Sequence, residues 1–436
     1  MYASHILFTS ICVAYVVLIR RLRFRRAAHH ARLVADSSNL DNEEMPLPVA
    51  QEIYDSLMHA EFPFWIWKGI EMGLFRTYAI PTISAQLAKT SRLLPPKLPR
   101  RYVETQVLFL EFTLRKWGTV PWLQAMARTR AIHAGYRESG AVREEDMLYT
   151  LAALATTPVL LVEKLEWRSL SDVELAAIGT LYRAIADALE IDYSLYLASW
   201  TPGEQRTSIV GLDFYHALHR WQVRHEIRHM VYMPQNELLC EAAVDMLLWA
   251  IPGKPLKRFV TTALTSVMDD LLREAVGFPP TPFWIAHTTY AVLDIRKFCL
   301  RYLCPPRPDF LKIQWCDSDP SSIQCAFAVD KSFCRHGRPD KEFAGSCRTD
   351  PPRTGMTTYV AAPFFVKPTF RNRWLSPKAW WWWALRLPIP GDKPVVHKAG
   401  GYTIPDLGPR GLGCMDAAQE KEEAKVETVG LAKGWW

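Results

Sequence analysis

The sequence predicts an all-α protein in which one large helical domain carries the function. From Leu47 to about Leu303, apolar residues recur at the i, i+3, i+4 spacing that buries one face of a helix. Alternating patterns typical of strands are scarce, and no repeat of fixed period predicts a solenoid. Because 49% of the 436 residues are hydrophobic, the chain can bury a substantial core. The periodicity predicts helices over residues 102–117, 121–138, 147–165, 171–190, 236–250, 258–276 and 284–303.

Residues 1–20 are expected to form a transmembrane anchor. Residues 2–19 contain no Lys, Arg, Asp or Glu, and about 20 apolar residues span the hydrocarbon core of a bilayer. Five arginines follow this run, whereas a cleaved signal peptide carries its positive charge before the apolar run. Positive residues favour the cytosolic side, so we expect the N-terminus in the lumen and the body in the cytosol. The arginines are Arg20, Arg21, Arg23, Arg25 and Arg26.

Residues 21–46 are expected to form a basic juxtamembrane linker, and residues 47–310 the helical domain. The formal net charge is +7, and its densest cluster adjoins the apolar run instead of lying on a folded face. This position argues against a nucleic-acid partner. Turn signals separate the predicted helices, and Cys304–Pro308 ends the helical region. The internal turn signals are Pro95-Pro96, Gly140, Ser169–Ser171, Thr201–Gly203, Ile251–Gly253 and Pro279-Pro280.

Three segments follow the helical domain. Residues 311–355 are expected to be a flexible insertion, whose four cysteines lack the close Cys-x-x-Cys pairs of a typical zinc site. Residues 356–415 are rich in tryptophan beside basic residues, which suits either the headgroup layer of a membrane or packing onto the helical body. Residues 416–436 are charged and expected to be disordered. The nine cysteines of the chain, an odd number, do not indicate a disulfide scaffold.

A stripe of polar residues on one predicted helix is the first candidate site. Arg130, His133 and Arg137 are spaced i, i+3, i+7, so their side chains start from one face of the helix over 121–138. A neutral imidazole can ligate iron, and guanidinium groups on either side can pair with haem propionates. The spacing also fits a core histidine between two arginines that reach solvent, and spacing alone favours that interpretation.

A second motif points to different chemistry. His225, Glu226 and His229 match the pattern His-Glu-x-x-His, in which two histidines bind zinc and the glutamate acts as general base. Glu241 would have to be the third ligand of such a metalloprotease. Pro234 ends the helix soon after the motif, and Arg228 would place a cation beside the metal. With His216 and His219 nearby, the segment fits a solvated, basic helix face better.

Other enzyme signatures are missing from the sequence. No Gly-x-Ser-x-Gly elbow follows a strand pattern, and no glycine-rich phosphate loop occurs. A non-catalytic helical membrane protein that has lost cofactor binding is a further alternative to the two candidate sites.

A family resemblance favours the first site. The chain resembles the ER-bound oxygenases of fungal meroterpenoid pathways, whose type member cleaves a prenyl chain in mycophenolic acid biosynthesis. Those oxygenases are distantly similar to bacterial latex-clearing rubber oxygenases, which are all-α haem b proteins. The resemblance covers most of residues 45–310 and part of the tail. It rests on the segments Phe75–Ser84, Ala127–Gly140, Leu148–Leu151, Glu166–Leu175, Ile295–Phe298, Arg301–Leu303 and Pro388–Asp392.

The resemblance implies specific site residues. His133 matches the axial haem ligand, so it is also the expected metal ligand of the chain. An Arg-x-x-x-Thr pattern on the preceding helix matches Arg101 and Thr105. The rubber enzymes have a lysine just before that threonine, and this chain has Glu104 instead.

The resemblance also implies a mechanism and a location. From the chemistry of their side chains, Thr105 would hydrogen-bond oxygen and Arg101 would orient Glu104 or a propionate. Glu104, which departs from the family pattern, would act as a base at an allylic position. The expected reaction is oxidative cleavage of a carbon–carbon double bond in a lipophilic, prenylated substrate, with O2 as co-substrate. The expected fold has a globin-like core, and the expected location is the endoplasmic reticulum membrane with a single pass.

Overall fold

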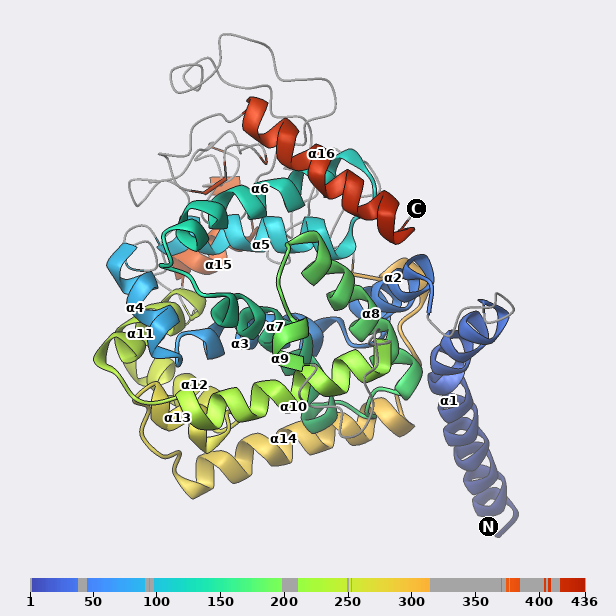
Figure 1. Cartoon of the computed structure of the whole chain (residues 1–436). Helices are drawn as coiled ribbons and strands as arrows, with labels where there is room; N and C mark the ends of the chain where they lie inside the picture. The colour runs from blue at the N-terminus through green and yellow to red at the C-terminus, as the bar shows by residue number, and fades with distance from the viewer. Residues whose placement is uncertain are drawn as a thin grey trace.

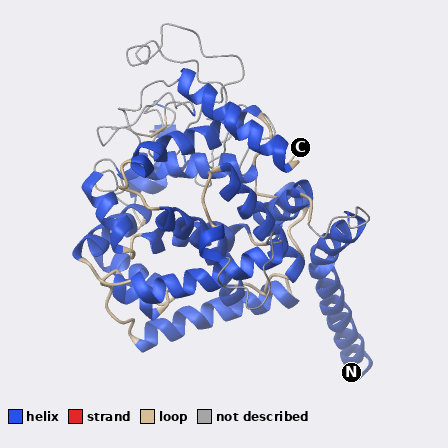
Figure 2. Ribbon diagram, in the orientation of Figure 1, coloured by secondary structure: helices blue, strands red, loops and turns tan. Residues whose placement is uncertain are grey.

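The computed structural model confirms the all-α prediction. Its described residues form helices joined by turns and loops, and none of them lies in a strand (Figure 2). The globin-like arrangement of the core stays a prediction. The structure describes residues 2–37, 45–90, 94, 98–197, 211–248, 251, 253–313, 370, 374–375, 377–384, 404, 407–408 and 416–435.

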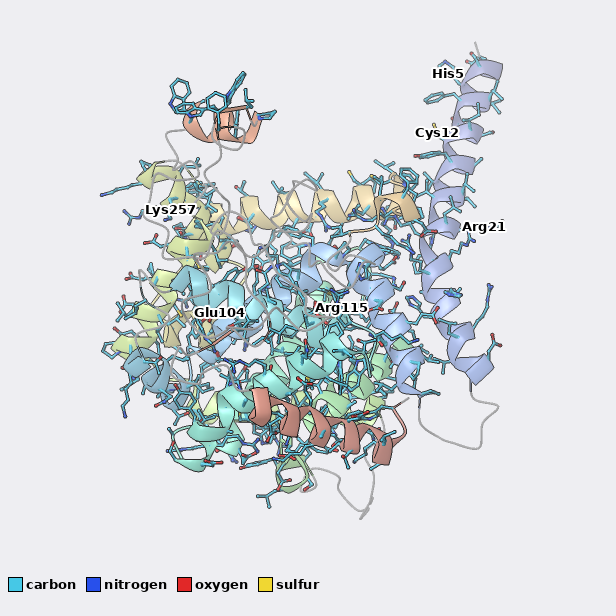
Figure 3. All side chains as sticks on the ribbon, turned by 90° about the horizontal axis from the view of Figure 1, so that it is seen from above. His5, Cys12, Arg21, Glu104, Arg115 and Lys257 are labelled. Carbon is cyan, nitrogen blue, oxygen red and sulfur yellow. The ribbon has the colours of Figure 1, made fainter. Side chains whose placement is uncertain are left out.

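The N-terminal helix α1, Tyr2–Ser37, begins in the predicted anchor and continues through most of the predicted linker. Its N-terminal half projects away from the helical body (Figure 1). His5 and Cys12 lie on the projecting part, and Arg21 lies near the level at which the helix meets the body (Figure 3). By length and composition, residues Ser4–Asp36 could cross a membrane, and so could the mostly buried core helix Glu144–Leu165.

The second half of α1 is packed against the body, which differs from the expected linker. The imidazole of His30 bonds through Nδ1 to Glu174 Oε1 at 2.9 Å and through Nε2 to Ser56 Oγ at 2.9 Å. Arg168 donates to the same glutamate at 2.7 and 2.8 Å. Arg26 pairs with the buried Glu61 at 3.2 Å. Buried ion pairs and hydrogen bonds therefore hold His30 and Arg26, residues of the expected juxtamembrane linker, against the body.

The first part of the body supplies the helices that surround the core. A π-helical turn, Leu57–Glu61, continues α2 before Pro63 starts α3. Helix α7 lies in the middle of the body, and α3, α8 and α10 pack against it (Figure 1). These helices are α2 (Leu47–Ser56), α3 (Pro63–Thr77), α4 (Pro81–Thr90), α5 (Leu98–Leu114), α6 (Val120–Glu138), α7 (Glu144–Leu165) and α8 (Asp172–Ala188).

Glycines allow α3 to cross α7 at close range. A Cβ atom built on Gly69 would lie 2.2 Å from the Cα atom of Pro158, and one on Gly73 would lie 2.5 Å from the carbonyl oxygen of Ala153. Neither distance leaves room for a side chain. The two glycines therefore set the depth at which α3 packs into α7.

The helices from α9 onward complete the body, and α14 forms one of its edges (Figure 1). Helix α14 runs along the edge of the body in Figure 1. The single helix predicted over 258–276 is divided into α12 and α13, because Asp269 caps a new helix by accepting from the backbone N–H of Leu272 at 2.9 Å. These elements are α9 (Ser194–Leu197), α10 (Gly211–His229), α11 (Pro234–Leu247), α12 (Lys254–Thr265), α13 (Asp270–Ala275), α14 (Phe283–Tyr302) and the 3-10 turn η3 (Asp309–Leu311).

The C-terminal tail differs from the expected disorder. Helix α16, Asp416–Lys433, packs on α6, and Glu422 pairs with Arg130 at 2.8 Å. The ring of Trp435 lies edge-on to Trp117 at 5.2 Å and near Trp122 at 6.2 Å between ring centroids. The charged composition of this segment predicted disorder, but an ion pair and aromatic contacts with the body hold it in a helix.

The two segments before this tail are described only in part. Helix α15, Pro377–Ala384, carries the exposed rings of Trp380, Trp381 and Trp383. The four cysteines of the predicted insertion lie outside the described residues.

Candidate active site

An apolar cavity of about 130 Å³ lies between α5, α6, α7 and α8. Leucine, isoleucine, phenylalanine and methionine make most of its wall. Such a wall excludes water and accepts apolar groups. The lining residues are Leu74, Arg101, Thr105, Leu108, Phe109, Phe112, Thr129, Ile132, His133, Met147, Thr150, Leu151, Leu154, Tyr182, Ile185, Leu189 and Ile191.

His133 borders this cavity from α6. Its Nδ1 donates a hydrogen bond to the carbonyl oxygen of Thr129, one turn earlier, at 2.8 Å. Burial lowers the pKa of the imidazole, and the positive charges of Arg101 and Arg137 lower it further. The ring is therefore neutral at pH 7, with the proton on Nδ1 and the lone pair on Nε2. A neutral imidazole fixed by a backbone carbonyl is the form in which histidine ligates a metal.

Arg101 and Thr105 approach the same cavity from α5. Their spacing of four residues places both on the face of α5 that lines the cavity. The hydroxyl of Thr105 donates to the carbonyl oxygen of Arg101 at 3.0 Å. Glu104 is buried, with 4% of its surface exposed, but it is not part of the lining. The structure thus brings together three of the predicted residues, namely Arg101, Thr105 and His133.

Arg130 and Arg137 extend from α6 to the end of α8 and do not line the cavity. Arg130 donates to the carbonyl oxygen of Ala188 at 3.0 Å and pairs with Glu190 at 2.7 Å. Arg137 donates to the carbonyl oxygen of Leu189 at 3.1 Å and to that of Glu190 at 2.7 Å. The two guanidinium groups thus hold the turn that follows α8. Their assignment to haem propionates stays a prediction.

The His-Glu-x-x-His segment matches the expected solvated, basic face only in part: Arg228 and His229 are exposed, whereas His225 and Glu226 are buried. The ring of His225 is stacked between Tyr149 and Trp221, at 4.9 and 5.0 Å between ring centroids. Glu226 is buried and accepts hydrogen bonds from Arg76 Nε at 2.9 Å and from the Tyr149 hydroxyl at 3.0 Å. A carboxylate held by a buried guanidinium is not available as a general base, which removes the residue that the protease alternative requires.

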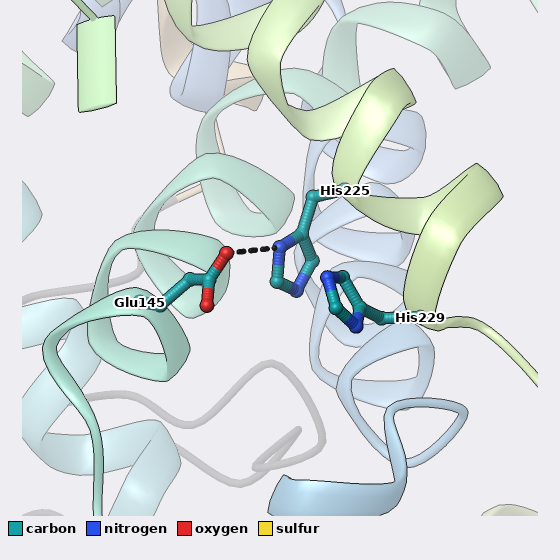
Figure 4. A group of neighbouring side chains, drawn as sticks. All are labelled: Glu145, His225 and His229. Carbon is teal, nitrogen blue, oxygen red and sulfur yellow. Dashed lines mark hydrogen bonds and ion pairs between the residues drawn. The ribbon is translucent and has the colours of Figure 1, made fainter.

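Glu145, which the motif analysis did not consider, approaches this segment from α7. Its Oε1 atom lies 3.1 Å from Nδ1 of His225 (Figure 4). Glu241, the third ligand expected for a protease, is exposed on α11 and is not part of the group. The contact joins residues 80 positions apart in the chain, so helical spacing gave no signal for it.

Helices that enclose an apolar cavity, with a neutral imidazole at its wall, define a class of α-helical protein that has room for an apolar group inside the fold. Comparison with known proteins identifies the family. Residues 57–299 match the family "ER-bound oxygenase mpaB/B'/Rubber oxygenase, catalytic domain". The chain belongs to this family, so it is an oxidoreductase of the oxygenase type.

Two curated relatives cover most of the chain, and a third covers a shorter part of it. The chain is 33% identical to the ER-bound oxygenase mpaB' of Penicillium brevicompactum, over 96% of this chain and 92% of the relative. It is 32% identical to the ER-bound oxygenase mpaB of the same organism, over 88% and 83% of the two chains. The ER-bound oxygenase mpaB of Penicillium roqueforti (strain FM164) is 34% identical over 61% of this chain and 87% of its own length. Oxygenase relatives imply a small-molecule substrate and O2.

Proposed function

We propose that the protein is a haem-dependent oxygenase and that His133 is its ligand to the iron. One observation carries the proposal: a neutral imidazole at the wall of an apolar cavity, with Nδ1 held by the Thr129 carbonyl oxygen at 2.8 Å. Haem iron is commonly held by one histidine nitrogen, and a hydrogen bond from the other nitrogen orients the ring. The donor set therefore fits haem b.

Haem b, when bound, would supply the iron chemistry with O2, and the chain's residues would set its surroundings. The apolar wall, which includes Leu108, Phe109 and Phe112, would exclude water from the reacting groups. The Thr105 hydroxyl donates to a backbone carbonyl, so it can accept a hydrogen bond as it stands and must rotate to donate into the cavity.

Charged residues near the cavity have separate proposed roles. Arg101 is the lining residue whose charge can pair with a propionate. Arg130 and Arg137 can contribute only if they exchange their contacts with the turn after α8. Glu104 lies outside the lining, so its proposed role as a base requires its side chain to turn toward the substrate.

We further propose a lipophilic, prenylated substrate that is cleaved oxidatively at a carbon–carbon double bond. An isoprenoid chain offers methyl and methylene groups that match the leucine, isoleucine and phenylalanine wall. The oxygenase family and its rubber oxygenase members support the same class of substrate.

An absorbance spectrum and metal analysis of the detergent-solubilised full chain test the cofactor proposal. We expect a Soret band and about one iron per chain, as for a single haem ligand set. Zinc without iron and without a Soret band would contradict the haem proposal, but it would not restore the metalloprotease alternative, because Arg76 holds Glu226. The absence of both iron and zinc would support a non-catalytic membrane protein.

We also propose that α1 anchors the protein in the ER membrane by a single pass, with the body in the cytosol. The apolar side chains of the projecting half are exposed, for example Ile6 and Phe8, each at 68%. The arginines from Arg20 onward follow this half, as expected on the cytosolic side. Protease added to intact microsomes should digest the body, and a protected body would contradict this topology.

Helix α14 supports contact between the body and the same membrane. The Tyr15 hydroxyl donates to the carbonyl oxygen of Leu303 at 2.7 Å, and Arg23 Nε donates to that of Cys304 at 3.0 Å. The C-terminal end of α14 therefore lies at the level where α1 would leave the bilayer. In both Figure 1 and Figure 3, α14 follows the edge of the body toward which α1 projects.

Exposed apolar side chains cover this edge. Aromatic and aliphatic residues on one helix face are typical of a helix lying in the membrane interface. Phe259 of α12 stacks on Trp284 of α14, with 6.2 Å between ring centroids, so the two helices form one surface. The α12–α14 face consists of Leu256, Phe259, Phe283, Trp284, Val292, Ile295 and Phe298.

An environment-sensitive dye can test the α12–α14 face in the full chain. In vesicles of ER lipids, a dye on Ile295→Cys should report an apolar surrounding. The same dye on Glu138→Cys, an exposed position on α6, should report water. Equal spectra at both positions would exclude membrane contact by this face.

A further inference from the structure

A cluster of metal-binding side chains lies apart from the cavity, on the outer side of α7 and α10. Glu145 comes from the first turn of α7, and His225 and His229 come from the last two turns of α10. One ligand atom from each residue lies within 4.8 Å of the ligand atoms of the other two. Figure 4 shows the carboxylate of Glu145 facing His225 and the imidazole ring of His229 next to that of His225.

We propose that Glu145, His225 and His229 form a binding site for a divalent transition-metal ion of the zinc class. Two imidazoles and one carboxylate suit such an ion, and solvent can complete its coordination. The site is separate from the proposed haem ligand His133. It is also not a protease centre, because Glu226 is held by Arg76.

The distances within the cluster suit a shared ion. Two ligands that bind zinc with bonds of about 2.0–2.1 Å at a tetrahedral angle lie about 3.3 Å apart. Glu145 Oε1 and His225 Nδ1 are 3.1 Å apart, close to this separation. The ring of His229 lies 4.6 Å from that of His225 between centroids, so a change of side-chain rotamer can bring its nitrogen to the same ion.

The surroundings of the three residues favour a ligand over a purely structural contact. The side chain of His225 is 4% exposed, and its Nε2 atom is buried without a hydrogen-bond partner. Hydrogen bonds therefore do not account fully for the burial of this imidazole.

The carboxylate and the second imidazole are accessible to an ion from solvent. His229 is exposed at the end of α10, and within the described residues its ring nitrogens make no hydrogen bond. Among the three acidic residues of the first turn of α7, Glu144 pairs with Arg137 and Asp146 accepts from Thr82. Glu145 is the one that turns to the histidines.

A bound ion would join α10 to the start of α7. Within the next two turns of α7, Met147, Thr150 and Leu151 form part of the cavity wall. Metal binding to the folded chain alone raises its stability by mass action. The expected effect of the ion is therefore to stabilise the wall of the cavity from outside.

Zinc titration of the purified full chain tests the site. After treatment with a chelator, calorimetry with ZnCl2 should show about one zinc per chain. His229→Ala and Glu145→Gln should each weaken zinc binding by at least about tenfold. His216→Ala, which removes a histidine of the same helix outside the cluster, should leave zinc affinity unchanged. Added zinc should raise the melting temperature of the wild type and of His216→Ala, but not that of His229→Ala.

Iron content and the visible spectrum, read in the same samples, keep this test separate from the haem proposal. Because His229 is exposed at a helix end, His229→Ala should keep the wild-type circular dichroism spectrum. Failure of the wild type to bind zinc at micromolar concentration would overturn the proposed site. Equal zinc affinity in the wild type, His229→Ala and Glu145→Gln would also overturn it.

Discussion

At the scale of single residues, the candidate site depends on the different directions taken by three side chains of one helix. Arg130, His133 and Arg137 begin on one stripe of α6, as their spacing predicts. The imidazole is short and stays at the cavity wall, whereas the long arginines reach backbone carbonyls at the end of α8 and just after it. Spacing fixes where a side chain begins but not where a flexible one ends.

The contacts of the arginines predict a moderate effect on cofactor binding. Arg130→Ala and Arg137→Ala should each lower the haem-to-protein ratio less than His133→Ala does. Both should also lower the melting temperature, because each removes hydrogen bonds to the turn after α8. The ratio can be measured by absorbance after purification. Loss of haem from Arg137→Ala as complete as from His133→Ala would show that this guanidinium holds the cofactor directly.

The buried pair of Arg76 and Glu226 predicts a large effect on stability. Arg76→Ala should destabilise the fold by about 3–5 kcal/mol, because it leaves a buried carboxylate without its charge partner. Denaturant unfolding of Arg76→Ala, Glu226→Ala and the double variant measures the coupling. We expect the free energy of unfolding of the double variant to fall by much less than the sum of the decreases in the two single variants. Additive losses would mean that the two residues do not act as a pair.

At the scale of helices, periodicity predicted most elements but not their interruptions or their partners. Helix α6 was predicted over 121–138 and is observed over Val120–Glu138. The break between α12 and α13 depends on the Asp269 cap, a local hydrogen bond that a hydrophobic pattern does not report. Helix α16 depends on contacts with α6 that only the folded chain provides. The pairing of Glu145 with His225 was missed for the same reason.

The crossing of α3 and α7 predicts a contrast between two glycines. Gly69→Ala should destabilise the protein by at least about 1–3 kcal/mol, since its Cβ would meet Pro158 at 2.2 Å. Gly135→Ala on α6 is the matched control, because a Cβ there meets nothing within 4 Å. It should be neutral, or stabilising by up to about 1 kcal/mol. Similar losses in thermal melts of both variants would contradict the close packing of α3 on α7.

At the scale of the whole molecule, the all-α class was predictable because the helical period runs through the entire body. The attachment of α1 to that body was not, because it depends on ion pairs between distant residues. His30 and Arg168 reach the same buried carboxylate, Glu174, from different parts of the chain. From composition alone, His30 belonged to the basic segment after the apolar run, and Arg168 and Glu174 lay beside a turn signal. Nothing in that pattern indicated that the three side chains meet.

This network predicts a loss of stability in acid. Burial alone would raise the pKa of Glu174, but hydrogen bonds from Arg168 and His30 lower it from 4.5 to about 2. The folded state therefore holds the proton less tightly than the unfolded state does. The contribution is complete above about pH 4.5 and is lost as the pH falls toward 2. Melting temperatures of the wild type should fall more steeply over this range than those of Glu174→Gln, and parallel curves would contradict the assignment.

The visible spectrum of His133→Ala tests the central claim most directly. The wild type should show a Soret band, and the variant should lose it while keeping the helical circular dichroism spectrum. Added imidazole should restore the band, because it can occupy the space left by the ring and supply the missing nitrogen to the iron. A wild-type Soret band in well-folded His133→Ala without imidazole would contradict His133 as the iron ligand.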